Sequence, residues 1–309
     1  MYDIAVILIN YNSSKFTTDA IESIIKVTSI SLNYQIIVVD NASRYEDYIL
    51  VKDYILSLEA ENIKLFRSKI NTGFGAGNMF GIQFSNARYY AFINNDTLLK
   101  NDCLDVLFNF MKTHENIALC APQGYDENGN VLKGFDHFLS LKRELFGRKI
   151  FEKLNPKKYP KRNKKYEEPI KVQCIPGSFL FVDARSFDNV GGFDTNIFLY
   201  YEETDLAFRI SKLKEKNECY LMPKAEYIHF KGQSTAKSLA IKKEMKISLL
   251  YVLKKNSSYF SYLILKYYLT VQYLFKSIFK PKYFSLVVLF IQGAPLNKSL
   301  KQSQKIAVK

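Results

Sequence analysis

Four short apolar segments within the first hundred residues place the strongest constraint on the fold, because each ends abruptly in polar residues. They occupy positions 4–9, 35–39, 63–66 and 89–93. Each is too short for a helix and rich in β-branched or aromatic residues, which is typical of strands buried in a parallel sheet. Amphipathic segments between them predict helices. This repetition indicates an α/β fold with a doubly wound, mostly parallel, Rossmann-like sheet.

The fourth segment is followed directly by Asn94, Asn95 and Asp96. These polar residues are expected at the carboxyl edge of the sheet, where open α/β sheets bind ligands. A carboxylate there can bind one side of Mg²⁺ or Mn²⁺ while a diphosphate supplies further ligands. The alternative is that residues 95–97 cap a helix that we expect at 98–111. This segment alone is compatible with both interpretations.

Polar residues also follow the other three predicted strands, at 10–12, at Asp40 and at 71–78. A carboxylate such as Asp40 can accept a hydrogen bond from a nucleotide base or a ribose hydroxyl. Glycines at 73, 75 and 77 allow backbone N–H groups to approach a phosphate at the start of a helix. Their spacing differs from the dinucleotide-binding fingerprint. The alternative for these glycines is a tight turn with close helix–strand packing.

Three acids, Glu202, Glu203 and Asp205, begin a helix that we expect to extend to about residue 216. The positive end of a helix favours ionised carboxylates, so any of the three can act as a general base. The alternative is ordinary capping of the helix by acidic residues. Arg209 lies four residues after Asp205, which predicts a structural ion pair within the helix.

His229 stands at the end of an alternating apolar segment. Its position is compatible with a histidine of the hydrophobic core. The imidazole can equally serve as a metal ligand or donate a hydrogen bond to a phosphate.

The net charge of +14 resides almost entirely in the C-terminal part of the chain. Residues 1–236 hold 30 Lys and Arg against 29 acids, whereas 237–309 hold 14 Lys and one acid, Glu244. Tyr and Phe alternate with these lysines, which is typical of helices that lie in an anionic membrane surface. The alternatives are a helical appendage packed on the sheet, a contact to a second subunit in a homodimer, and single-stranded nucleic acid binding. We expect no nucleic acid partner, because basic residues hardly outnumber acidic ones in residues 1–236.

A second basic segment, 148–171, holds ten Lys and Arg, three Glu and three prolines. We expect a long mobile insertion there, serving as a lid over an acceptor, as a contact for anionic head groups, or only as a solvated loop.

The four cysteines lack the spacing of metal ligands and indicate reduced thiols of a cytosolic protein. The chain begins directly with a predicted strand rather than a signal peptide, and no window is apolar enough for a membrane span. We therefore expect a cytoplasmic protein, peripheral at the cytoplasmic face of the cell membrane.

Seven motifs occur in order along the chain. They are ILINYNSS (7–14), VVDNAS (38–43), NTGFGAGNMFGI (71–82), FINNDT (92–97), GSFLFVDARSFDNVGGFD (177–194), YYEETDLAFR (200–209) and HFKGQST (229–235). Together they resemble the inverting family 2 glycosyltransferases of the GT-A fold, in particular the rhamnosyltransferase-like branch. The resemblance covers about 1–236 and implies a GT-A glycosyltransferase domain there, followed by a helical tail at 237–309.

The resemblance implies roles for individual residues. Glu203 matches the catalytic base, where the family more often has Asp. Asp96 matches the last position of the metal motif, and His229 matches a late histidine that contacts metal or diphosphate. Asn94 and Asn95 depart from the commoner Asp-containing motif, which leaves Asp96 as its only carboxylate. The implied donor-binding residues are Asn10, Asn12, Asp40, Asn71, Gly75, Asn78 and Asn95.

The implied activity moves a sugar, with inversion, from a nucleoside-diphosphate donor to a hydroxyl of a glycan or polyprenyl-linked acceptor in surface polysaccharide synthesis, assisted by Mn²⁺ or Mg²⁺. One alternative is a sugar nucleotidyltransferase, which predicts a Gly-rich first loop with Lys or Arg; ILINYNSS has neither. The other is a non-catalytic, membrane-associated subunit that binds a sugar nucleotide. Such a subunit predicts loss of the metal or base carboxylate, whereas Asp96 and Glu203 are both present.

Overall fold

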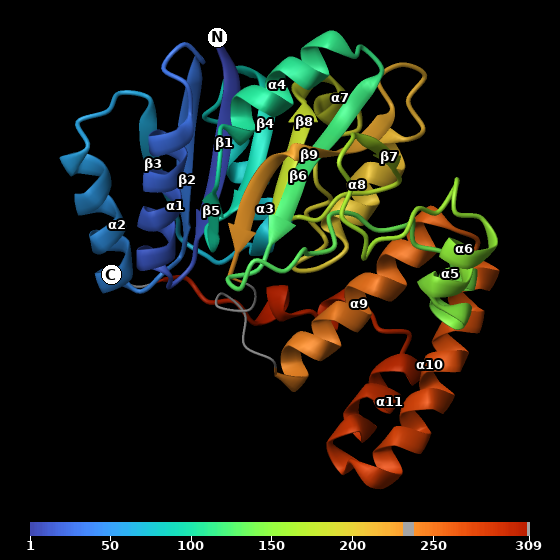
Figure 1. The fold of residues 1–309 in the computed structure, drawn as a ribbon. Helices are drawn as coiled ribbons and strands as arrows, with labels where there is room; N and C mark the ends of the chain where they lie inside the picture. Colours follow the sequence, from blue (N-terminus) through green and yellow to red (C-terminus); the bar gives the residue numbers. More distant parts are fainter. Residues whose placement is uncertain (231–237, 308–309) are drawn as a thin grey trace.

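The computed structural model describes residues 1–230 and 238–307 (Figure 1). Residues 231–235 of the seventh motif therefore lie outside the described part of the chain. The strands are β1 (Tyr2–Asn10), β2 (Tyr34–Asn41), β3 (Ile63–Ser68), β4 (Ala87–Asn94), β5 (Thr97–Leu99), β6 (Ile117–Tyr125), β7 (Ile170–Val172), β8 (Phe179–Asp183) and β9 (Glu218–His229). The helices are α1 (Ser14–Val27), α2 (Tyr45–Ser57), α3 (Gly73–Ile82), α4 (Cys103–Thr113), α5 (Leu141–Phe146), α6 (Arg148–Leu154), α7 (Ala184–Asn189), α8 (Glu202–Ile210), α9 (Leu239–Asn256), α10 (Tyr259–Phe279) and α11 (Phe284–Ile291). Short 3₁₀ turns follow at η1 (Pro281–Tyr283), η2 (Leu296–Lys298) and η3 (Leu300–Ser303).

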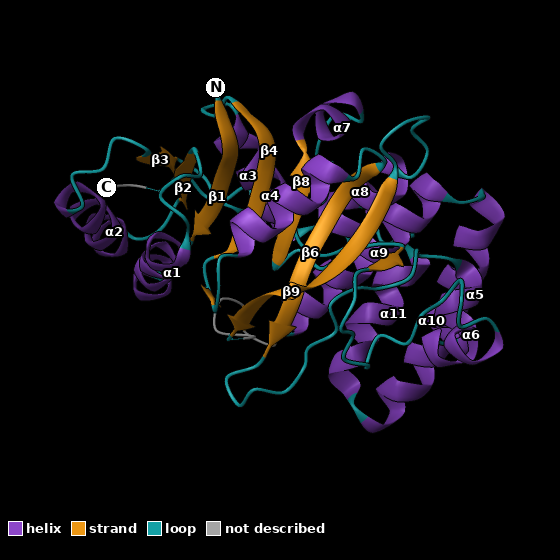
Figure 2. Cartoon of the chain, turned by 45° about the horizontal axis from the view of Figure 1, so that its top comes forward, coloured by secondary structure: helices purple, strands orange, loops and turns teal. Residues whose placement is uncertain are grey.

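All the described strands belong to one mixed sheet with the order β3-β2-β1-β4-β8-β6-β9-β5, and β7 pairs with β9. β1 to β4 run parallel, as predicted, and β6 runs parallel to β9. β8 is antiparallel to both of its neighbours. Helices α1, α2 and α4 pack on one face of the sheet, and α3, α7 and α8 pack on the other (Figure 2). The predicted α/β fold with a mostly parallel sheet is confirmed.

The chain after Asp96 differs from the prediction, which began a helix at residue 98. Residues 97–99 instead form β5 and pair antiparallel with the end of β9. The helix begins only at Cys103, and its cap is Asp102, whose side chain accepts a hydrogen bond from the Asp105 N–H at 3.0 Å. The alternative interpretation, in which residues 95–97 cap this helix, is therefore excluded, because residues 97–99 pair with β9 and Asp102 is the cap.

The segment predicted as a mobile insertion also contains regular structure. It opens with α6, which directly follows α5. Arg148 and Arg162 both donate to Asp136, at 2.8 and 3.1 Å, and Arg162 also donates to Glu152 at 2.7 Å. These charge-assisted hydrogen bonds join the segment to the preceding loop. Residues 148–154 are therefore helical, while the mobility and the role expected for 148–171 stay predictions.

The C-terminal helices α9, α10 and α11 surround a third hydrophobic cluster, to which Leu139 and Ile197 also contribute. They form the predicted helical appendage, which extends away from the sheet (Figure 1). One of its links to residues 1–230 is Asp205 of α8, which is 0% exposed. This carboxylate forms the predicted ion pair with Arg209 and also accepts from Lys255 and Asn256 of α9, at 3.0 Å each. Among the described helices, none is long and apolar enough to cross a membrane.

After η3 the chain returns to the sheet. Ile306 forms an antiparallel bridge with Ile70, and the Ala307 N–H donates to the Lys69 carbonyl at 2.8 Å. The last part of the appendage therefore contacts the loop between β3 and α3 (Figure 1).

Gly73 brings the start of α3 into contact with the loop before α8. Its φ of +82° is in the left-handed region, and an added Cβ would lie 2.1 Å from the Phe198 carbonyl oxygen. That oxygen also accepts from the Phe74 N–H at 3.0 Å. A side chain at position 73 would therefore force the two segments apart.

We predict that Gly73→Ala lowers the free energy of unfolding by about 3 kcal/mol or more, because backbone strain and overpacking add. Gly129→Ala is the matched control, since Gly129 has a φ of +79° with open space around it. That variant should lose only about 1 kcal/mol, from strain alone. Denaturant unfolding of both variants measures the difference. Equal losses in the free energy of unfolding would show that the close contact with Phe198 adds nothing to the backbone strain.

Candidate active site

A cleft of about 700 Å³ lies where the strand ends meet the appendage. Strand ends, the start of α3 and the start of α8 contribute to its wall, and so do the end of β9 and the C-terminal segment. The lining includes Asn41, Asn71, Gly73, Asn94, Asn95, Gly177, Ser178, Glu202, Glu203, Tyr227, His229, Ser238, Ile241, Leu300 and Gln304. Residues from both ends of the chain thus line one cavity.

Asp96 and His229 lie side by side, because Thr97 of β5 pairs with His229 of β9. The distance from Asp96 Oδ1 to His229 Nε2 is 3.2 Å. The contact has an ion-pair distance but not the geometry of a hydrogen bond, so this buried oxygen has no hydrogen-bond partner among the described groups. A carboxylate oxygen without a partner beside an imidazole suits a divalent cation, provided that a bound ligand supplies further oxygens. Within 1–230 and 238–307, no cluster of three or more His, Cys, Asp or Glu could hold a metal ion.

Glu202 and Glu203 stand at the start of α8 and both line the cleft. The two preceding residues, Tyr200 and Tyr201, have φ values of 72° and 71°. Left-handed backbone is unfavourable for aromatic residues, by about 1–2 kcal/mol each, and such strain is concentrated at functional sites. These residues form the tight turn from which α8 begins at the wall of the cleft.

The environments of the two carboxyls favour protonation. Burial raises the pKa of Glu203 to about 7, and the charge of Asp136 adds to this rise. Burial, together with the nearby charge of Glu203, raises the pKa of Glu202 well above its usual range. Glu202 is 2% exposed, and its Oε1 has no hydrogen-bond partner among the described groups. Glu203, which is less buried, is the carboxyl of this pair with a pKa suited to a general base near neutral pH.

Asn10 and Asp40, two of the predicted donor-binding residues, are both 0% exposed and lie outside the cleft lining. The Asn10 amide donates to Asp40 at 3.0 Å and to Asp47 at 2.8 Å. Asp40 also forms an ion pair with Arg67 at 3.2 Å. In this structure the two side chains hold the ends of β1 and β2 together. Their roles toward a donor stay predictions.

Asn71 and Asn95, two further predicted donor-binding residues, both line the cleft, and their roles toward a donor stay predictions. The Asn95 amide N–H groups donate to the hydroxyls of Ser13 and Thr17, at 2.7 and 2.8 Å. The side-chain carbonyl oxygen of Asn95 takes no part in these two bonds. Asn71 accepts from the Gly73 N–H at 2.9 Å, so it shapes the start of α3.

The other three predicted donor-binding residues make structural contacts. Asn12 is exposed, with a φ of 52°, and accepts from the Arg44 N–H at 2.8 Å. Asn78 is 1% exposed and donates to the Phe74 carbonyl at 3.0 Å. An added Cβ on Gly75 would lie 3.4 Å from Glu202 Cγ, which fits the packing alternative for the glycines. None of the three lines the cleft.

Asn41 is a cleft residue that the sequence analysis did not select. Its amide donates to Asn71 Oδ1 at 3.1 Å and to the Gly73 carbonyl at 3.0 Å, and its carbonyl oxygen accepts from the Thr72 N–H at 3.0 Å. It follows Asp40 in the second motif, and that position at a strand end was the signal that could have identified it.

Comparisons with known proteins identify the family of the chain. A family model described as Glycosyl transferase family 2 matches residues 5–190. The minor teichoic acid biosynthesis protein GgaB of Bacillus subtilis is 31% identical over 37% of this chain and 13% of its own length. The N-acetylglucosaminyl-diphospho-decaprenol L-rhamnosyltransferase of Mycobacterium tuberculosis is 38% identical over 22% of each chain. The poly(ribitol-phosphate) beta-glucosyltransferase of Bacillus spizizenii is 25% identical over 50% of this chain and 24% of its own length. The chain thus spans only part of these relatives.

A crystal structure of GalNAc-T7 with UDP, GalNAc and Mn²⁺ matches with a TM-score of 0.61 and 14% sequence identity, over 82% of this chain and 48% of that one. Such a likeness concerns the fold, and it confirms the predicted GT-A-like architecture. The family model covers more than half of the chain, from β1 to the end of α7. The protein belongs to glycosyl transferase family 2.

Proposed function

We propose that this protein is an inverting, metal-dependent glycosyltransferase that moves a sugar from a nucleoside-diphosphate donor to a hydroxyl of a glycan or polyprenyl-linked acceptor. The observation that carries the proposal is a single cleft lined by both Glu203 and His229 in a family 2 chain. Asp96 is 1% exposed and lies behind this lining, with its Oδ1 3.2 Å from His229 Nε2. The printed names of the relatives concern teichoic acid synthesis and a diphospho-decaprenol-linked sugar. These names support an acceptor in surface polysaccharide synthesis and the rhamnosyltransferase-like branch.

Asp96 and His229 are the residues that would hold Mn²⁺ or Mg²⁺. Support comes from the Asp96 oxygen that lacks a hydrogen-bond partner next to the imidazole. When bound, the cation would neutralise negative charge on the leaving nucleoside diphosphate. With two protein ligands, the remaining coordination would come from diphosphate oxygens and water.

Glu203 is the proposed general base. It would take the proton from the acceptor hydroxyl as that oxygen attacks the anomeric carbon from the side opposite to the diphosphate, which inverts the anomeric centre. Gly177 lies beside this carboxylate, since an added Cβ there would be in ordinary van der Waals contact with Glu203 Oε2, at 3.9 Å.

The donor would bind along the amide-rich wall made by Asn41, Asn71 and Asn95. The Asn95 carbonyl oxygen takes no part in the bonds to Ser13 and Thr17, so it can accept a hydrogen bond from a sugar hydroxyl. Asn41 uses its amide on Asn71, Gly73 and Thr72 and would therefore shape this wall. We place the reaction at the cytoplasmic face of the cell membrane, where a polyprenyl-linked acceptor would be available.

We predict that Asp96→Asn lowers metal-stimulated donor hydrolysis by roughly 100-fold, because the cation loses its carboxylate ligand. Hydrolysis of a panel of nucleoside-diphosphate sugars with and without Mn²⁺ measures this. Asp53→Asn, which changes an exposed acid on α2, serves as the control and should retain full activity. Undiminished hydrolysis by Asp96→Asn would remove the metal role.

We predict that acceptor-dependent kcat/KM rises with pH to a plateau, with a midpoint at about 7. The direction follows from the raised pKa of Glu203, since only the ionised carboxylate accepts a proton. Glu203→Gln should lower turnover by about 10²–10⁴-fold and abolish this rise. Glu203→Asp keeps a carboxylate and should retain a pH-dependent residual activity. An unchanged pH profile in Glu203→Gln would assign the base to another group.

A further inference from the structure

Helix α10 is apolar on two opposite sides. Its inward side packs in the appendage core through Tyr262, Leu265, Leu269 and Tyr273. Its outward side carries Phe260, Leu263, Tyr267, Leu274 and Ile278, which we call the α10 stripe; these residues are between 38% and 73% exposed. Their spacing places them along one line of the helix. A surface helix of a soluble domain is ordinarily polar on its outward side, so the α10 stripe requires a partner.

Lysines lie at both ends of the α10 stripe. The Lys254 ammonium lies 5.7 Å from the ring centroid of Tyr259 at the start of the helix. Lys276, Lys280 and Lys282 follow at its end. In the described part of the chain, none of these four forms an ion pair with an acid at 4.0 Å or less. The stripe is therefore flanked by positive charge that no carboxylate neutralises.

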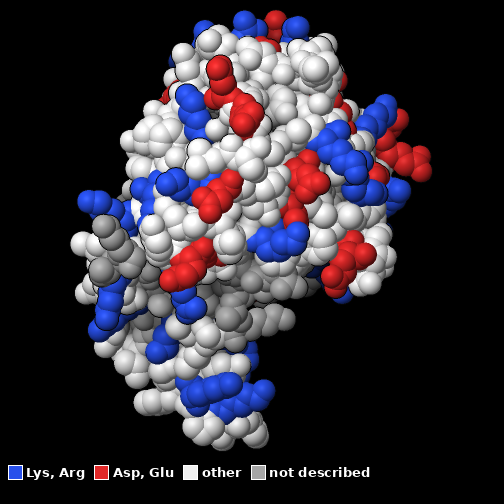
Figure 3. Space-filling view, turned by 90° about the vertical axis from the view of Figure 1, so that its left-hand side faces the viewer, with Lys and Arg blue, Asp and Glu red and all other residues white. Residues whose placement is uncertain are grey.

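A hollow beside the end of α10 continues this basic surface. Lys243, Lys282 and Lys298 line it together with Phe284 and Val288 of α11. The tail's single acid, Glu244, is 1% exposed and accepts hydrogen bonds from Ser299 and the Leu300 N–H, so it does not offset the lysines at the surface. On the face seen in Figure 3, which is the left-hand side of Figure 1, the lower part shows basic side chains and no acids, whereas acids are frequent on the upper part.

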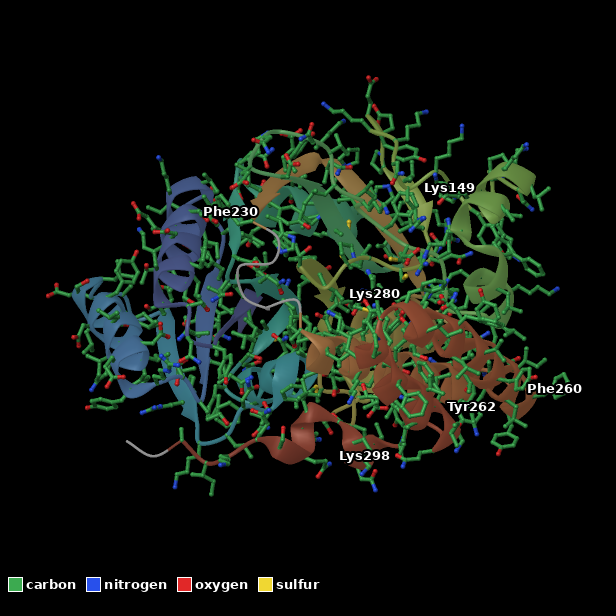
Figure 4. The ribbon with its side chains drawn as sticks, turned by 90° about the horizontal axis from the view of Figure 1, so that it is seen from below. Lys149, Phe230, Phe260, Tyr262, Lys280 and Lys298 are labelled. Carbon is green, nitrogen blue, oxygen red and sulfur yellow. The ribbon has the colours of Figure 1, made fainter. Side chains whose placement is uncertain are left out.

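Helices α5 and α6, which neighbour α10, also expose apolar side chains beside a lysine. α5 packs against α10, and α6 follows it directly, on the same side of the molecule (Figure 1). Phe146 at the end of α5 and Ile150 and Leu154 of α6 are exposed, and the exposed Lys149 precedes Ile150. Figure 4 shows Lys149 and Phe260 on the side of the molecule that lies away from β1 to β3.

We propose that the α10 stripe docks on an anionic phospholipid bilayer, with its apolar side chains in the interface and the flanking lysines against lipid phosphates. Amphipathic helices bind bilayers through this combination of buried apolar area and attraction to anionic lipids. The appendage would then hold the cleft close to the membrane. That consequence for a lipid-linked acceptor rests on the proposed function, whereas the docking itself does not.

Charge favours a bilayer over a second copy of the chain as the partner. Residues 237–309 hold 14 lysines and one acid, so pairing two appendages through the α10 stripe would bring two strongly positive surfaces together. Like charges across an interface are unfavourable, whereas an anionic bilayer supplies complementary charge.

The test is flotation of the full chain with vesicles of phosphatidylcholine alone or with 30% phosphatidylglycerol. The wild-type chain should bind the anionic vesicles, bind neutral ones far more weakly, and lose affinity as salt increases. The triple variant Phe260→Ser, Tyr267→Ser, Ile278→Ser should lose at least tenfold in binding to the anionic vesicles. Each single lysine variant should bind the anionic vesicles roughly fivefold more weakly, which corresponds to about 1 kcal/mol. These variants are Lys276→Gln, Lys280→Gln and Lys282→Gln.

The matched control changes three exposed apolar residues of the body, Ile30→Ser, Leu50→Ser and Leu56→Ser, and should bind as the wild type does. Thermal unfolding verifies that all variants fold. Equal vesicle binding by the stripe variant would overturn the proposal. A stripe-dependent dimer in sedimentation, without vesicle binding, would also overturn it and assign the stripe to self-association. Vesicle binding without sugar transfer would refute only the proposed function.

Discussion

The antiparallel pairing of β5 with the end of β9 is the contact on which the site depends. It places Thr97 opposite His229, and so brings Asp96 within 3.2 Å of the imidazole. The two residues come from distant parts of the chain, and each alone has an ordinary explanation as a cap or a core residue. Paired, they leave a buried carboxylate oxygen without a hydrogen bond, which is unfavourable unless a ligand compensates it.

A second contact connects the carboxylates of α8 to the appendage. Asp205 is fully buried on the helix that carries Glu203, and it binds Arg209 within the helix and Lys255 and Asn256 of α9. A buried carboxylate with several charged and polar partners holds its neighbours in a defined arrangement, because breaking one bond exposes the charge to an apolar interior. The position of α8 and the orientation of the appendage are therefore coupled.

The appendage is more than an addition to the sheet, because it completes the wall of the cleft. Ser238 and Ile241 from the start of α9, and Leu300 and Gln304 near the C-terminus, lie in the same lining as Asn71 and Glu203. The bridge between Ile306 and Ile70 returns the chain to the loop before α3. A surface that binds the α10 stripe would for this reason also position the cleft.

The sequence by itself determined the parallel half of the sheet, the polar strand ends and the ion pair of Asp205 with Arg209, because hydrophobic periodicity and short spacing are local signals. It also identified Asp96, Glu203 and His229 as candidates. Only the tertiary structure decided that 97–99 form a strand, that Asn41 lines the cleft while Asn10 and Asp40 are enclosed, and that the C-terminal segment reaches the site. These outcomes depend on pairing and burial between distant segments, which the local pattern of a chain does not encode.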